Sequence, residues 1–150
     1  MAEFDVIEQE LDKHGVYASI TSGTSMRPLF KTHRDMVIIE KPKGELKKYD
    51  VALYHSKTGN DYVLHRVIAV REEDYVIRGD NTFVKEYVPK KAIVGVLTVF
   101  NRKGKRHSTE DLGYRIYSVI WNFIYPLRFV FRCFRTVLAK VYRKIFRKKS

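Results

Sequence analysis

The chain has 150 residues and a net charge of +12, a length typical of one domain with enough residues to bury a core. Its single cysteine, Cys133, excludes an internal disulfide framework. The longest nearly unbroken apolar stretch, residues 116–127, is too short to span a bilayer. Ten of the 29 basic residues and none of the 17 acidic residues lie in residues 112–150. The charge therefore marks a nearly neutral region followed by a strongly basic tail.

The first predicted element is a short amphipathic helix within residues 1–15. Phe4, Ile7 and Leu11 recur at helical spacing among charged residues, and Gly15 follows as a stop. The first 13 residues lack the apolar segment of a secretory signal, so we expect no signal peptide here.

Residues 16–101 read as a β domain. The predicted strands, rich in Val, Ile, Leu and Tyr, are residues 16–21, 36–40, 50–55, 62–71, 75–78 and 92–100. Residues 57–61 are predicted to form a hairpin loop. Short strands without helices between them predict a mainly β fold, an antiparallel barrel or sandwich.

Residues 102–111 are predicted to be a basic hinge, and residues 112–150 a helical tail. Apolar side chains of this tail share one arc at 100° per residue, and basic side chains share the opposite arc. The residues that carry this pattern include Phe131, Phe134, Arg128, Arg132 and Arg135. Pro126 is expected to divide the tail into two helices, residues 110–125 and 127–148.

Residues 22–28, Ser-Gly-Thr-Ser-Met-Arg-Pro, follow directly on a predicted strand. This composition indicates a rigid turn with a hydroxyl at its tip, although most such clusters are only loops. Ser25 becomes a candidate nucleophile if a base reaches it. His65 is the candidate base, because its unperturbed pKa of about 6.5 suits proton transfer near neutrality. The plainer interpretation of His65 is a histidine satisfied on a half-buried strand.

The ordered motifs resemble the signal peptidase I superfamily, the serine peptidases that also include the self-cleaving SOS-response repressors. The resemblance covers roughly residues 16–100. It rests on residues 22–28 as the nucleophile box, 34–39 and 49–54 as two Asp-then-apolar strands, 63–68 as the general-base box and 78–81 as the final Gly-Asp box. Most bacterial members carry lysine at the base position. His65 instead resembles the Ser-His branch found in the endoplasmic reticulum, in archaea and in sporulation.

The resemblance implies that Ser25 is the acylated nucleophile and His65 the general base. The backbone N–H of Ser25, with Ser22 beside it, would bind the oxyanion, and Met26 would line the substrate site. No metal or other cofactor is expected.

The acidic member of the site stays open at this point. Asp80 lies in the Gly-Asp-Asn turn itself, where an aspartate most often satisfies turn amides. The Ser-His branch places its acidic partner several residues later, which here falls near Glu86.

The function implied is that of a serine endopeptidase that cleaves a leader or signal segment in a peptide or protein substrate. Two alternatives remain: a non-catalytic module with a degenerate peptidase fold that binds peptide or anchors a complex at a membrane, and a self-cleaving peptidase.

Family members usually carry a transmembrane helix before the nucleophile box, where this chain has only the short acidic helix. We therefore expect the tail to contact an anionic membrane surface, with Trp121 at headgroup depth. Packing on the β domain or in a partner's groove is the alternative, and nucleic acid ranks last. The expected location is the cytoplasm or the cytoplasmic face of a membrane. The opposite face stays open, because signal peptidases act there.

Overall fold

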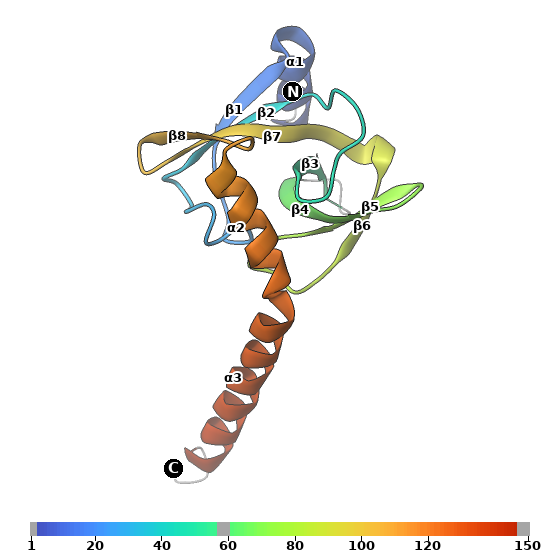
Figure 1. The fold of residues 1–150 in the computed structure, drawn as a ribbon. Helices are drawn as coiled ribbons and strands as arrows, with labels where there is room; N and C mark the ends of the chain where they lie inside the picture. The colour runs from blue at the N-terminus through green and yellow to red at the C-terminus, as the bar shows by residue number, and fades with distance from the viewer. Residues whose placement is uncertain (1–2, 57–60, 147–150) are drawn as a thin grey trace.

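The computed structural model describes residues 3–56 and 61–146 (Figure 1). The expected loop at residues 57–61 lies mostly outside the described residues. The helices are α1 (Glu3–His14), α2 (Leu112–Phe123) and α3 (Tyr125–Phe146), with a 3-10 turn, η1 (Lys90–Ala92). The strands are β1 (Val16–Ile20), β2 (Met36–Glu40), β3 (Val51–His55), β4 (Tyr62–Val70), β5 (Asp74–Arg78), β6 (Glu86–Pro89), β7 (Ile93–Arg102) and β8 (Lys105–Ser108).

The eight strands form one antiparallel sheet in the order β1-β2-β7-β3-β4-β5-β6, with β8 paired to β7. The prediction of a mainly antiparallel β fold is confirmed, but the barrel is wrong, because the sheet does not close. Within the described part of the chain, β1 pairs only with β2 and β6 only with β5. Both outer edges therefore keep free backbone groups, of the kind that can pair with another strand.

Two apolar clusters hold the curved sheet together. One joins Leu11 of α1 to Phe30 and to residues of β2, β3 and β7. The other gathers Tyr54, Val67 and Ile77 from β3, β4 and β5. The long strand β7 passes between them, with Leu97 in the first cluster and Val96 packed against the second. The helix predicted at the N-terminus thus closes one side of the core.

The segment predicted as a hinge is instead a β-hairpin. β7 continues to Arg102, and β8 returns from Lys105, with these two residues paired across a two-residue turn. Lys103 and Gly104 have φ values of 51° and 77°, the positive φ at both central positions that type I′ hairpin turns require. Glycine adopts this conformation freely, so Gly104 marked a turn here and not a flexible joint.

The tail consists of two helices interrupted at Ile124, as the position of Pro126 predicted, with bounds shifted by a few residues. Proline lacks the N–H that would bond one turn back. Hydrogen bonds from Ile124 N to Ile120 O (3.0 Å) and from Arg128 N to Ile124 O (3.1 Å) continue the helical ladder on both sides. The two helices therefore keep a common phase. α2 lies against the β domain, and α3 extends away from it (Figure 1).

Candidate active site

His65 projects from β4 into a buried site and contacts two polar groups through Nδ1. Glu86 Oε1 lies 3.0 Å from this nitrogen and the Tyr54 hydroxyl 3.2 Å. When Nδ1–H donates to Glu86, Nε2 has no proton and can accept one. Burial lowers the pKa of His65 below its ordinary 6.5, and the Glu86 charge offsets part of that shift. The imidazole is therefore neutral at pH 7, the state that a general base needs.

Tyr54 was not singled out from the sequence, where it is one aromatic residue in a strand. It is 1% exposed, and burial together with the Glu86 charge raises its pKa far above that of a free tyrosine. Its hydroxyl therefore stays protonated beside the carboxylate and the imidazole. Only the antiparallel pairing of β3 with β4, which sets Ala52 opposite His65, brings Tyr54 to this place.

Ser25 and His65 both lie next to Gly79. A Cβ atom built on Gly79 would lie 2.7 Å from the Ser25 carbonyl oxygen and 3.0 Å from His65 Nε2. The serine main chain and the imidazole are thus in contact with the same Cα, which explains why glycine occupies this position. Asn81 N donates to the Ser25 carbonyl (2.7 Å), and its side-chain amide donates to Thr24 O (3.2 Å).

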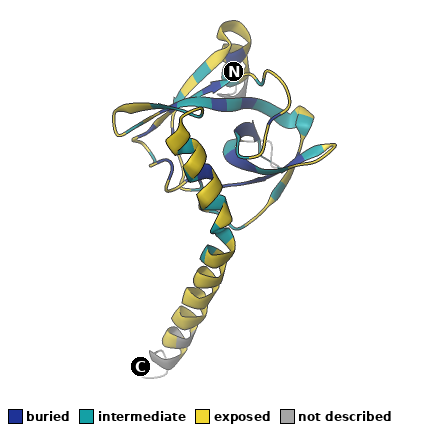
Figure 2. Cartoon of the chain, viewed as in Figure 1, coloured by how far each residue is buried: buried dark blue, intermediate teal, exposed yellow. Residues whose placement is uncertain are grey.

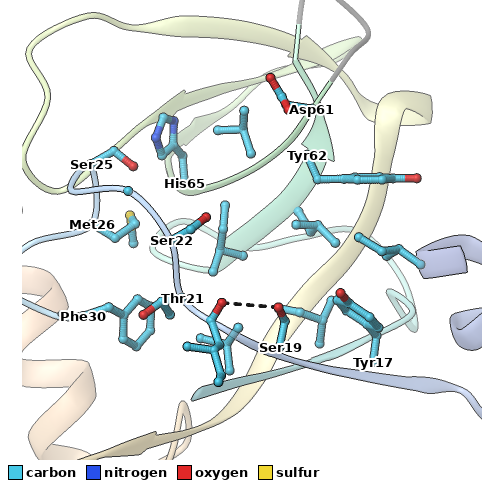
Figure 3. A pocket seen from close by; sticks show the side chains of 18 residues that line it. Tyr17, Ser19, Thr21, Ser22, Ser25, Met26, Phe30, Asp61, Tyr62 and His65 are labelled. Atoms are coloured by element: carbon cyan, nitrogen blue, oxygen red, sulfur yellow. Dashed lines mark hydrogen bonds between the residues drawn. The ribbon is translucent and has the colours of Figure 1, made fainter. Parts of the chain in front are cut away.

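Figure 3 shows the Ser25 side chain beside the imidazole ring. Ser25 Oγ makes no hydrogen bond to another described residue. Long catalytic contacts are common when substrate is absent. Ser22, at the rim, is exposed, whereas Met26 is buried and lines the same cleft.

Asp80 does not contact His65. It forms a bidentate ion pair with Arg66, with Nε–Oδ1 at 2.8 Å and Nη2–Oδ2 at 2.9 Å. His65 and Arg66 are consecutive on β4, so their side chains point to opposite faces. Asp80 therefore lies behind the strand, whereas Glu86 lies on the His65 side. Of the two acidic candidates, the geometry brings only Glu86 to the imidazole.

The Arg66–Asp80 pair is enclosed by α2. Arg66 is 0% exposed, and its Nη1 donates to Ser118 Oγ (2.8 Å) and to the Tyr114 hydroxyl (3.1 Å). The Tyr117 hydroxyl donates to Asp80 Oδ2 (2.9 Å). A buried charge pair needs such additional hydrogen bonds to offset its desolvation. Helix α2 therefore supplies part of the structure directly behind the site.

Two residues assigned to the membrane face of the tail contact the domain instead. Trp121 Nε1 and Arg128 Nη2 both donate to the Asp80 carbonyl, at 2.9 and 2.8 Å. The Arg128 guanidinium also lies 3.7 Å from the centre of the Trp121 ring. The helical arcs of the sequence separate apolar from basic residues, but they do not show which arc meets the domain. Phe131 and Phe134 are exposed, as expected.

A cleft of 540 Å³ opens beside Ser25 and His65 (Figure 3). β1 and the first half of β4 form two of its walls, and Phe30 and Leu53 form part of its apolar floor. In the described part of the chain, β5 pairs with residues 66–70 of β4, so residues 63–65 have an open edge on that side. The cleft therefore lies between two strand edges that a further strand could bridge.

Comparison with known proteins finds no matching family model and no curated protein with significant similarity. In the described part of the chain, no group of three His, Cys, Asp or Glu side chains is close enough to hold a metal ion.

Proposed function

We propose that this protein is a serine endopeptidase of signal-peptidase type that cleaves a leader or signal segment through an acyl-enzyme on Ser25. The observation that carries the proposal is the arrangement around His65. Glu86 is hydrogen-bonded to Nδ1 of the imidazole. Nε2 of the same ring and the Ser25 main chain both lie against Gly79. This order of nucleophile, base and orienting acid is the arrangement that activates a serine hydroxyl.

In the proposed reaction, Ser25 Oγ attacks the scissile carbonyl carbon while His65 Nε2 takes the hydroxyl proton. The C–N bond then breaks, and the imidazolium gives that proton to the departing amine. A water molecule, deprotonated by the same nitrogen, hydrolyses the ester and restores Ser25. Glu86 keeps the imidazole oriented and stabilises its positive charge during both steps. The backbone N–H of Ser25 is the proposed oxyanion donor.

The substrate would bind as an extended strand in the cleft. The free edge of β1 and the open edge of residues 63–65 offer main-chain hydrogen bonds, and the apolar floor takes alternate side chains. This mode depends little on side-chain charge, which suits a leader with small apolar residues near the cut.

A fluorophosphonate probe tests the nucleophile. We expect stoichiometric labelling of the full chain, loss of labelling in Ser25→Ala, and a rate at least 100-fold lower in His65→Ala. Peptide mapping should find the adduct on Ser25, and Ser22→Ala should still be labelled. Equal labelling of wild type and Ser25→Ala would refute the proposal. It would favour a domain that binds peptide without cleaving it.

A further inference from the structure

The two C-terminal helices share an exposed apolar face, which we call the apolar stripe. Its six most exposed members are each at least 60% exposed: Leu112, Phe123, Leu127, Val130, Phe131 and Phe134. Because α2 and α3 keep a common helical phase, these side chains fall on one side of both helices. From residue 112 to 138 the stripe is about 40 Å long at 1.5 Å per residue. Figure 2 shows how little of α3 is covered.

The β domain does not cover this stripe. The opposite face of α2 makes the contacts to the domain, through Tyr117, Ser118 and Trp121. Tyr114 and Tyr117 of α2 pack against the core of the domain, whereas the apolar stripe stays exposed. A continuous exposed apolar surface of this length indicates an interaction site.

The basic residues of the tail indicate which kind of partner covers the apolar stripe. Arg135 and Lys140 are exposed on α3, and residues 112–150 contain no acidic side chain. A nucleic acid would neutralise this charge but leave the stripe in water. An apolar groove on a protein would cover the stripe but has no need of ten positive charges. An anionic lipid surface satisfies both, because the stripe enters the acyl boundary while the basic side chains meet headgroups.

We propose that α2 and α3 dock the protein on an anionic membrane, with the apolar stripe in the lipid and both helix axes parallel to the surface. No described helix is long and apolar enough to cross a bilayer. The Asp80 turn packs on the face of α2 opposite the stripe. Docking thus holds that turn about one helix diameter, about 10 Å, from the lipid. This proposal does not depend on Ser25 being a nucleophile.

Vesicle flotation with the full chain provides the test. Vesicles of phosphatidylcholine are compared with vesicles that contain 30% phosphatidylglycerol. The stripe variant is Val130→Ser/Val137→Ser, at positions 63% and 57% exposed. The matched control is Val6→Ser/Val70→Ser, at positions 44% and 40% exposed outside the tail. Valine and serine have similar helix propensity, so α3 should persist in the stripe variant, which circular dichroism checks.

We expect binding to anionic vesicles that falls about tenfold in the stripe variant and is unchanged in the control. Arg135→Gln/Lys140→Gln should lower binding to anionic vesicles about 30-fold, because each charge near the surface contributes about fivefold. Absence of anionic vesicle binding, or equal loss in stripe variant and control, would overturn the proposal. So would a dimer in solution that the stripe variant dissociates, because the occupant would then be a second copy. Vesicle binding without probe labelling would refute only the peptidase.

Discussion

Replacing Gly79 by alanine separates a catalytic site from a chance arrangement. The added Cβ would lie 2.7 Å from the Ser25 carbonyl oxygen and 3.0 Å from His65 Nε2. Ordinary contacts of a Cβ begin at 3.4 Å, so the serine main chain must move by about 0.7 Å away from the added Cβ, which changes its position relative to the imidazole. Misplacement of reacting groups by about 1 Å can lower a rate about 100-fold.

We therefore expect Gly79→Ala to lower the rate of fluorophosphonate labelling about 100-fold. Overpacking of this kind should cost about 1–3 kcal/mol of unfolding free energy, so the variant stays folded if the protein has ordinary stability. Gly44→Ala is the matched control, because a Cβ at that position has nothing within 4 Å. It should label at the wild-type rate.

The assay is the second-order labelling rate, with urea unfolding measured on the same samples. Wild-type labelling by a folded Gly79→Ala variant would refute the argument that Ser25 and His65 act together at Gly79. Equal loss in Gly44→Ala would show that labelling responds to general destabilisation.

Two further predictions follow from the charges in the structure. Glu86→Gln should slow labelling at least tenfold. Because Glu86 raises the pKa of His65, the variant should have a lower His65 pKa. The pH below which the labelling rate falls should therefore also be lower in the variant. An unchanged pH dependence would place Glu86 outside the site. Asp35 is buried and bonded to Arg34, which lowers its pKa to about 2. Its carboxylate therefore stabilises the fold above pH 4, and this stabilisation is lost as the pH falls toward 2. Asp35→Asn should cost about 2 kcal/mol near neutrality, with a smaller difference at pH 2.5. If urea unfolding gives the same difference in free energy between wild type and Asp35→Asn at both pH values, the ionised Asp35 carboxylate is not the cause of the stabilisation.

Much of the fold could be predicted from the sequence, because apolar and polar residues alternate along the strands and apolar residues recur at helical spacing along the helices. These patterns missed β6 and β8, which are short and contain Pro89 or Lys105, residue types that are depleted in strands. Their pairing depends on neighbours, Ile77 opposite Glu86 and Asn101 opposite Arg106. The spacing of apolar residues alone therefore did not distinguish these strands from loops.

For the candidate site, motif order pointed to Ser25 and His65, and the structure brings them together at Gly79. To decide whether Asp80 or Glu86 is the acidic partner of His65, one must know on which side of β4 each carboxylate lies. One residue along a strand reverses that side. The partners of Asp80 in α2 are distant in sequence, so no local pattern could have indicated them.

The enclosure of Arg66 also determines where the chain can be shortened. Its Nη1 donates to one carbonyl of the domain, Tyr49 O, and to two hydroxyls of α2. Removal of everything after residue 111 would take away both hydroxyls and open a buried guanidinium to water. A shortened chain that keeps both hydroxyls must extend beyond Ser118, and one that extends beyond Arg128 also keeps the hydrogen bond from that side chain to the Asp80 carbonyl. Limited proteolysis should accordingly cleave within the exposed helix α3 and spare α2, which makes the first tail helix part of the folding unit.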